Sequence, residues 1–198
     1  MLRLLEWHVI AYVAPTASKK AMFQSLQHYQ EDSQVLQHNA AEVALVNGIG
    51  SLPQQTFRRD VFEHFTEKGF DFPAVVHPSA IVAQSVKLQA GVQVMAGAVI
   101  NPESHIAQNT IVNTRCTVDH DCNIGQHNHL APGATLSGGV TTGQNVHIGT
   151  GASVIQSITV HDNSIVGAGA TVTQDVPKDS IVYPARSVVK DIKNKVDE

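Results

Sequence analysis

Histidine is the side chain best suited to general-base catalysis near neutral pH, and this sequence concentrates it in one region. Seven of the 11 histidines fall within residues 77–161. Two pairs of residues have the same sequence separation, since the interval from His120 to Gly138 equals the interval from His129 to His147. A histidine beside a glycine backbone could remove a proton from a nucleophile while an N–H stabilises an oxyanion. Those are the groups that acyl transfer requires.

The shared interval has a structural meaning, because the chain repeats in hexads and both pairs are three hexads apart. From Val82 to Val172 an aliphatic residue occupies every sixth position, with Thr142 as the exception. Neither a helix nor an alternating strand has this period. Three hexads, each a short strand and a turn, make one triangular coil, and coils stack as parallel strands about 4.8 Å apart. We therefore expect a mainly β protein with a parallel β-helix, in which residues three hexads apart are neighbours.

Cysteines and the remaining histidines take their positions from the same repeat. Cys116 and Cys122 occupy the small-residue position of consecutive hexads, so we expect them to point inward as small hydrophobes. That orientation argues against a metal site and against a nucleophilic thiol. The other histidines of the repeat are expected to be exposed at corners: His105, His127, His147 and His161.

Before the repeat, the pattern changes to that of an α/β unit with a parallel sheet. Buried strands are predicted at residues 7–13 and 42–50, the second running into a glycine turn. A helix is predicted over residues 56–68, ended by Gly69, and residues 72–76 are predicted as a strand that leads into the coil. The predicted organisation is a small α/β domain (1–76), the β-helix (77–186) and a C-terminal tail (187–198) with a short basic helix.

Composition excludes several classes of partner. The formal net charge is -4 and the chain has no basic block, so nucleic acid is a poor candidate. The apolar stretches fall far short of the roughly 20 residues that span a bilayer, and the first residues lack the features of a signal peptide. We expect a cytoplasmic protein without membrane insertion.

Residues 77–190 resemble the hexapeptide-repeat acyltransferases in their uninterrupted hexads. The resemblance implies a left-handed coil, a homotrimer, and acetyl-CoA bound between subunits with no metal. The segments Val46–Ser51, Arg58-Arg59 and His77–Ala80 resemble the subfamily that acylates sugars in bacterial glycan synthesis, including N-acetyltransferases of nucleotide-linked 4-amino-4,6-dideoxy sugars. In that subfamily a small Rossmann-like domain holds the nucleotide sugar. Its opening strand and glycine-rich turn have no counterpart here, so we expect this domain to be incomplete.

The resemblance also implies roles for individual residues. Val118–Cys122 matches the motif whose histidine is the proposed base, which makes His120 the base and Asp121 the residue that orients it. The same comparison places Asn113 near the base, His129 near the acceptor or acetyl group, and the Gly138 N–H at the thioester oxygen. Further candidates are the coenzyme groove residues Gly149, Gly151, Ala152, Ala168 and Arg186, and the nucleotide-sugar residues Gly48, Gly50 and Ser51.

Three other functions compete with sugar N-acetylation. A sugar O-acetyltransferase of the sialic-acid type needs the same base, so the residues do not separate an amine from a hydroxyl acceptor. A β-helix that has lost catalysis is favoured by the absent glycine-rich turn and opposed by His120 and Gly138. A hexapeptide carbonic anhydrase would bind zinc through histidines such as His120, His129 and His147 from neighbouring subunits, but it gives the N-terminal segment no role.

Overall fold

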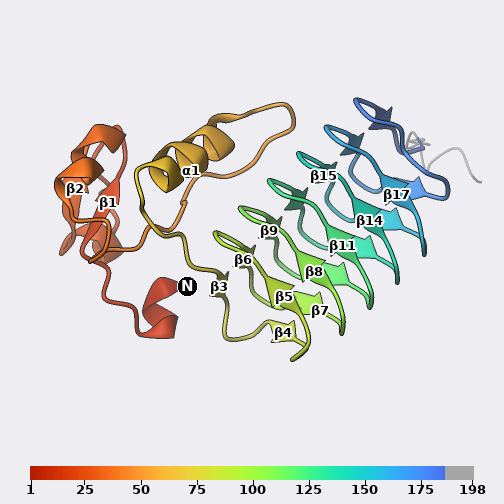
Figure 1. Cartoon of the computed structure of the whole chain (residues 1–198), viewed down its shortest axis with the longest axis horizontal. Coiled ribbons are helices and arrows are strands. Elements are labelled where there is room, and N and C mark those ends of the chain that lie inside the picture. The colour runs from red at the N-terminus through yellow and green to blue at the C-terminus, as the bar shows by residue number, and fades with distance from the viewer. Residues whose placement is uncertain (186–198) are drawn as a thin grey trace, which may run out of the picture.

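The computed structural model of the chain describes residues 1–185. It consists of a long triangular coil with a smaller N-terminal part at one end (Figure 1). In that view the helix α1 (Phe57–Glu67) lies between the coil and the short strands β1 (Ala11–Val13) and β2 (Gln27–Tyr29). No helix within the described residues is long and apolar enough to cross a membrane.

The coil has three faces, each a parallel sheet of two-residue strands. The first face contains β4 (Ile81–Val82), β7 (Val99–Ile100), β10 (Thr117–Val118), β13 (Thr135–Leu136), β16 (Ser153–Val154) and β19 (Thr171–Val172). The second face contains β5 (Lys87–Leu88), β8 (His105–Ile106), β11 (Asn123–Ile124), β14 (Thr141–Thr142) and β17 (Thr159–Val160). The third face contains β3 (Val75–Val76), β6 (Gln93–Val94), β9 (Ile111–Val112), β12 (His129–Leu130), β15 (His147–Ile148), β18 (Ile165–Val166) and β20 (Ile181–Val182).

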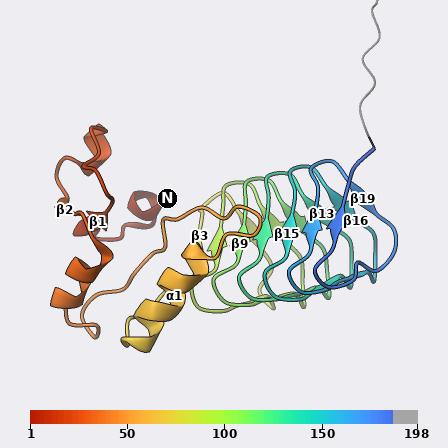
Figure 2. The same cartoon turned by 90° about the horizontal axis from the view of Figure 1, so that it is seen from above.

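Turns at three corners join these faces, and Figure 2 shows the coils stacked along one axis. We call the turns from the first to the second face the first corner, those from the second to the third face the second corner, and those from the third to the first face the third corner. The register is the predicted one, because strands pair with strands three hexads away, as in His129↔His147. The coil begins slightly before its predicted start, since β3 already pairs with β6.

The core is a column of aliphatic side chains, one from each strand except β14, as the repeat predicts. Cys116 and Cys122 point into it and are buried, which confirms their predicted orientation. Burial raises the pKa of the Cys116 thiol to about 12, so this group stays protonated at neutral pH. The exceptional Thr142 is also buried, and its hydroxyl accepts a hydrogen bond from the Asn128 side chain at 2.6 Å.

The N-terminal part departs from the predicted strands. Of residues 7–13, only Ala11–Val13 form a strand, and Trp7 and Ile10 are exposed instead of buried. Residues 42–50 form no strand beyond a single parallel bridge from Ala44 to Asp71. The two predicted strands do not pair with each other. Both line a largely apolar cavity of about 590 Å³, which leaves these apolar side chains without the cover that a continuous sheet would provide.

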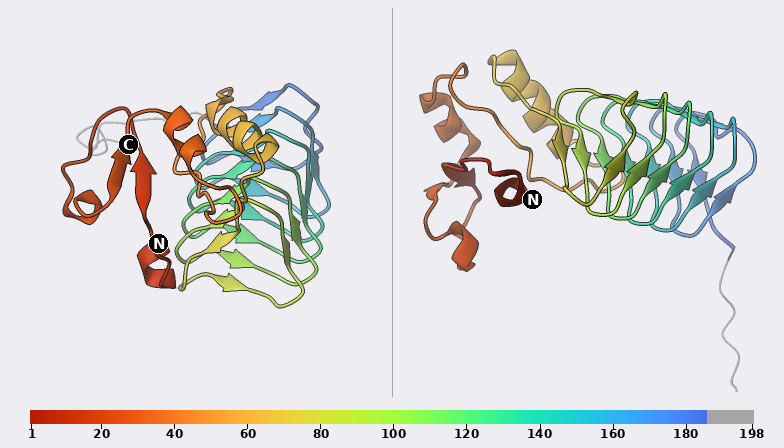
Figure 3. Two further views of the ribbon diagram at one scale, coloured as in Figure 1. Left: turned by 60° about the vertical axis from the view of Figure 1, so that its left-hand side comes forward. Right: turned by 90° about the horizontal axis from the view of Figure 1, so that it is seen from below.

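Helix α1 is the predicted helix, and it fixes the N-terminal part to the coil. Phe62 and Phe65 are buried on its inner side, and Gly69, with φ of 85°, follows its last turn. The Phe62 ring contacts Phe72 with ring centroids 4.8 Å apart, and it meets the edge of His127 at the second corner. The two views of Figure 3 show α1 beside the coil and the sheet of β1 and β2 standing outside it.

Candidate active site

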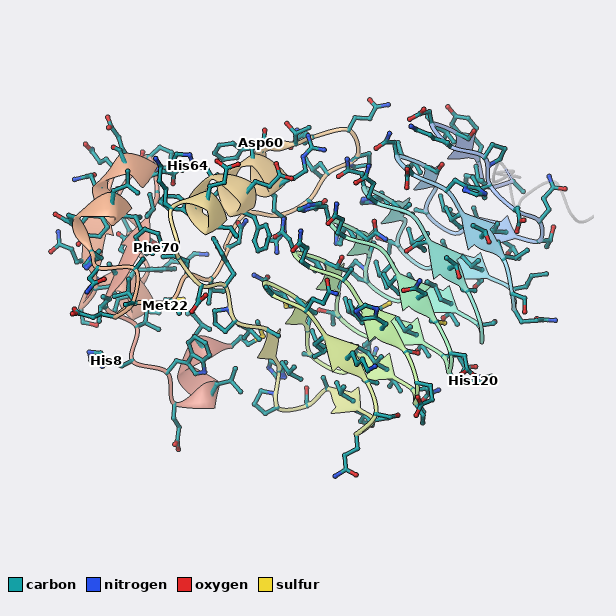
Figure 4. The ribbon with its side chains drawn as sticks, viewed as in Figure 1. His8, Met22, Asp60, His64, Phe70 and His120 are labelled. Atoms are coloured by element: carbon teal, nitrogen blue, oxygen red, sulfur yellow. The ribbon has the colours of Figure 1, made fainter. Side chains whose placement is uncertain are left out.

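His120 lies at the first corner, in the turn between β10 and β11. Figure 4 shows it at the edge of the coil, away from α1. The turn requires a left-handed backbone at Asp121, where φ is 58°, and the Asp121 N–H donates to the Pro102 carbonyl of the preceding coil at 3.1 Å. Aspartate tolerates this conformation better than bulkier residues do. The repeat therefore presents two consecutive polar side chains on a fixed corner.

The His120 and Asp121 side chains form the dyad that the family resemblance implies. Their Nδ1 and Oδ2 atoms lie 2.7 Å apart. Because a carboxylate only accepts hydrogen bonds, Nδ1 carries the proton and Nε2 keeps a lone pair. The hydrogen bond to Asp121, and next the negative charge of Asp119, raise the pKa of His120. The His120 side chain is 60% exposed, so a substrate from solvent can reach Nε2.

Gly138 lies beside His120, as the interval of three hexads predicts. A Cβ on residue 138 would fall 2.7 Å from both Cε1 and Nε2 of the imidazole. The neighbouring Gly139 N–H donates to the His120 carbonyl at 2.9 Å, which fixes this approach. Within residues 1–185 the Gly138 N–H makes no hydrogen bond. A base and a free backbone donor therefore share one corner, which is the arrangement that acyl transfer needs.

Sequence reasoning missed a second carboxylate in this turn. Asp119 Oδ1 accepts hydrogen bonds from the Asn101 side chain and from the His120 N–H, both at 2.8 Å. These bonds lower the pKa of Asp119, so it stays charged. The signal was present in the sequence, because Asn101 precedes Asp119 by one coil. Asp119 holds the backbone of His120 through the bond to its N–H, whereas Asp121 orients the imidazole ring.

Asn113 and His129 lie together on another part of the coil. Asn113 follows β9 at the third corner, and its Nδ2 donates to His129 Nε2 at 3.0 Å. Within one chain Asn113 occupies the third corner and His120 the first, so the predicted proximity of Asn113 to the base would need a second copy of the chain and stays a prediction. His129 Nδ1 donates to the Ser51 carbonyl at 3.0 Å. Both ring nitrogens of His129 are therefore engaged, and the ring is the neutral Nδ1–H tautomer.

Burial explains the state of His129. Desolvation first, and then the positive potential of His147 and Arg58, lower the pKa of His129 to about 4. The rings of His129 and His147 meet edge to face, with centroids 4.9 Å apart. A histidine with both nitrogens occupied and a pKa this low is unsuited to act as the base at neutral pH. It instead attaches the loop at Ser51 to the third face.

Three of the four histidines predicted to be exposed corner residues are at least half-buried. The His127 side chain is only 4% exposed, because α1 packs over it, and desolvation lowers its pKa to about 4. Its Nε2 lies 3.5 Å from Glu63, a contact that is not an ion pair while the ring is neutral. His147 is half-buried and lines a cavity of about 290 Å³ beneath residues 51–56. His161 is exposed as predicted, and His105 is half-buried on β8.

The predicted groove residues differ in their environments. Gly149 has no room for a side chain, since a Cβ would lie 2.6 Å from the Ala168 nitrogen. Gly151 occupies a turn with φ of 64°, and Ala168 is exposed on the next coil at the same third corner. Ala152 is fully buried in the core, so its side chain cannot line a groove outside the coil. Arg186 and the predicted tail helix lie outside the described residues.

The loop Asn47–Ser51 is held by side chains that bind its carbonyl groups. Arg58 Nη1 donates to the carbonyls of Asn47 and Ile49 at 2.9 and 2.6 Å. Gln93 Nε2 donates to the Asn47 carbonyl at 2.7 Å. A Cβ on Gly48 or Gly50 would meet nothing within 4 Å, and neither residue has a positive φ. Nothing within the described chain requires glycine there, which leaves open space for a ligand.

The triangular coil and the corner carrying His120, Asp121 and Gly138 define a β-helix acyltransferase. Residues 139–174 match the family described as "Bacterial transferase hexapeptide (six repeats)". The structure of perosamine N-acetyltransferase (PerB) from Caulobacter crescentus, in complex with CoA and GDP-perosamine, is 33% identical. That match covers 91% of this chain and 84% of PerB, with a TM-score of 0.78.

The acetyltransferase domain of PglB from Neisseria gonorrhoeae FA1090 is 30% identical, with 93% of this chain and 89% of that domain covered and a TM-score of 0.81. WeeI from Acinetobacter baumannii AYE, at 21% identity, shares the fold, with 86% and 81% of the two chains covered and a TM-score of 0.74. The coil is thus a left-handed β-helix, as predicted. The chain belongs to the hexapeptide-repeat sugar acyltransferases.

Proposed function

We propose that this protein transfers an acetyl group from acetyl-CoA to the amino group of a nucleotide-linked 4-amino-4,6-dideoxy sugar in bacterial glycan synthesis. The observation that carries the proposal is the first corner, where His120 is oriented by Asp121 and lies against the free N–H of Gly138. The two relatives at 30% identity or more support the choice of substrates. One was solved with CoA and GDP-perosamine, and the other with acetyl coenzyme A.

The geometry supports direct transfer. His120 Nε2 accepts a proton from the sugar amine as its nitrogen attacks the thioester carbonyl. The Gly138 N–H donates a hydrogen bond to the carbonyl oxygen as it becomes negative. The C–N bond forms, the C–S bond breaks, and the imidazolium returns its proton to the departing thiolate of CoA. Asp121 stabilises the imidazolium between these two steps by accepting the hydrogen bond from Nδ1.

We also propose a cytoplasmic homotrimer with active sites between subunits. His120 occupies the first corner, whereas Asn113, Gly149 and Ala168 occupy the third corner of the same chain. A second copy that packs its third corner beside the first corner of its neighbour would bring the two sets together. Closed cyclic symmetry favours such a contact, because each copy then presents the same two surfaces.

The acceptor is proposed to bind at the loop Asn47–Ser51. Gly48 and Gly50 open to solvent, and the Ser51 carbonyl is attached to His129 on the coil. The bond to His129 couples the position of this loop to the third face. A nucleotide sugar bound there in a trimer would face the first corner of a neighbouring subunit.

The decisive test is thiol release from acetyl-CoA with a panel of nucleotide-linked 4-amino sugars, with mass spectrometry of the product. We expect release that depends on one sugar and falls by about 10²–10⁴-fold in His120→Ala. Light scattering on the same preparation should give the mass of a trimer. Full activity in His120→Ala would contradict the assignment of the base, and release without any acetylated sugar would contradict the assignment of the acceptor.

A further inference from the structure

Arg58, the second residue of α1, is a buried cation that has no acidic partner among residues 1–185. It is 6% exposed, and none of the ion pairs within residues 1–185 includes it. Burial lowers its pKa to about 10, so the guanidinium remains charged at neutral pH. Within the same residues its Nε and Nη2 atoms make no hydrogen bond. Burying an unpaired charge is costly, so this arrangement calls for an explanation.

The contacts of Arg58 show what it holds. Its Nη1 donates to the carbonyls of Asn47 and Ile49, and its own carbonyl accepts from Asn47 Nδ2 at 2.9 Å. Gln93 and His129 bind the carbonyls of Asn47 and Ser51 from the coil. Three alternate carbonyl groups of the loop are thus turned toward the protein.

Gly48 and Gly50 lie between these anchored residues, and both are exposed. Within the described chain, neither of their N–H groups makes a hydrogen bond, and no atom lies within 4 Å of a Cβ built on either residue. Gly48 lines the cavity of about 590 Å³ together with Asn47 and Ile49. Backbone donors without side chains allow a phosphate to approach closely. The Arg58 guanidinium contacts this segment through the carbonyls of Asn47 and Ile49, and within residues 1–185 no carboxylate pairs with its positive charge.

We infer that Arg58 is the positioning residue of the acceptor loop, and that its unpaired charge makes the loop favour an acceptor carrying a diphosphate over one without it. The inference rests on the proposed function and adds the part of the acceptor that is recognised. Arg58 acts through the loop backbone and through its field. A nucleoside diphosphate sugar would bind more tightly because its phosphates accept hydrogen bonds from the loop N–H groups and are attracted by the positive charge of Arg58. A free amino sugar has no phosphate and would make neither interaction.

The test compares Arg58→Met and Arg58→Lys with the matched control Lys68→Met in the full-length protein. Methionine keeps most of the side-chain volume of Arg58 and removes its charge. Lysine keeps the charge and removes the guanidinium group that can donate two hydrogen bonds side by side. Lys68 serves as the control because it is an exposed cation just beyond α1. Calorimetry gives the affinities for GDP and UDP and for guanosine and uridine. Steady-state kinetics give the KM for the sugar nucleotide and for acetyl-CoA separately.

We expect the wild type to bind one diphosphate at least about tenfold more tightly than its nucleoside, and Arg58→Met to lose most of this preference. The KM for the sugar nucleotide should rise about tenfold in Arg58→Met and less in Arg58→Lys, while the KM for acetyl-CoA stays unchanged. Lys68→Met should behave as the wild type. A loss of overall stability alone would lower kcat and would not separate the two KM values, and a loss of the loop's position alone would leave the preference for a diphosphate in place.

Two results would overturn the inference. One is a wild type without preference for a diphosphate over its nucleoside. The other is an Arg58 variant that keeps both the preference and the wild-type KM for the sugar nucleotide. Should Arg58→Met fail to fold, Arg58→Lys decides alone, since it keeps the charge and must still raise that KM. Because nucleotide binding is measured without turnover, a protein that binds diphosphates selectively but releases no thiol would contradict the proposed function only.

Discussion

The imidazole of His120 lies against Gly138 of the next coil, so closely that a Cβ on residue 138 would fall 2.7 Å from Nε2. Gly138 does not have a positive φ, so the glycine is required by its neighbour and not by its own backbone. The contact places the lone pair of the base and the free Gly138 N–H on one corner. Any side chain at position 138 would displace one of them.

Gly138→Ala should therefore reduce activity far more than stability. His120 is exposed and its ring can move away from the new methyl group, so we expect the free energy of unfolding to change by less than about 1 kcal/mol. The movement would break the 2.7 Å bond to Asp121 and should lower kcat/KM about 100-fold. Thermal melts and steady-state kinetics on the same preparation test both parts.

A double-mutant cycle shows whether that loss acts through the base. If Gly138→Ala only displaces His120, then His120→Ala with Gly138→Ala should be no less active than His120→Ala alone. A double variant slower than either single variant by the product of their effects would mean that the two residues act independently. That outcome would contradict the geometric argument.

The second prediction concerns pH. His120 must be neutral to accept a proton, and its pKa is raised, chiefly by the hydrogen bond to Asp121. kcat/KM should therefore fall with decreasing pH through an apparent pKa above the ordinary value of 6.5. Asp121→Asn removes the charge while keeping a side chain of the same size. It should move the acidic limb of the profile to lower pH and reduce the rate at the plateau.

A control tests whether the shift of the acidic limb in Asp121→Asn arises from the titration of His120. His120→Ala with Asp121→Asn should have no such limb, because no imidazole remains at the corner to titrate. An acidic limb at the wild-type position in Asp121→Asn would mean that another group controls the profile.

The coil could be predicted from sequence because a solenoid makes its contacts at fixed intervals. The same six-residue period sets the burial of Cys116, the pairing of His129 with His147, and the approach of His120 to Gly138. It also separates Asn113 from His120, since their positions differ by little more than one hexad, which spans about one face. The family motif therefore leaves Asn113 a prediction for an assembly, because a motif does not say which copy of the chain supplies each residue.

The N-terminal part was harder to predict because its structure depends on distant contacts. Residues 42–50 have the composition of a strand, yet Ala44 makes only one bridge, since strand formation depends on the neighbour as much as on propensity. The burial of His127 comes from Phe62 on α1, and that of His147 comes from residues 51–56. Hexad spacing contains no information about a helix that packs on the outside of a corner.

The third prediction concerns the pH dependence of stability that arises from two of the covered histidines, His127 and His129. In the folded protein the pKa of His127 and of His129 is about 4, below the ordinary 6.5, so the unfolded chain binds more protons between these values. Stability should therefore be full above pH 6.5 and decrease as the pH falls toward 4, by about 1–3 kcal/mol for each ring. His127→Gln should flatten this dependence, as measured by denaturant unfolding at a series of pH values. An equally steep dependence in that variant would exclude His127 as a contributor.

The final prediction concerns Gly48, which faces open space and has no positive φ. Gly48→Ala should leave the melting temperature unchanged or slightly raised, because alanine narrows the unfolded ensemble at a position whose backbone it can adopt. If the acceptor binds against this backbone, the added methyl group should raise the KM for the sugar nucleotide about tenfold and leave the KM for acetyl-CoA unaltered. Gly149→Ala is the contrasting variant, because its Cβ would lie 2.6 Å from backbone atoms of the next coil, so it should lower the melting temperature. A Gly48→Ala protein with wild-type KM for both substrates would place the acceptor elsewhere.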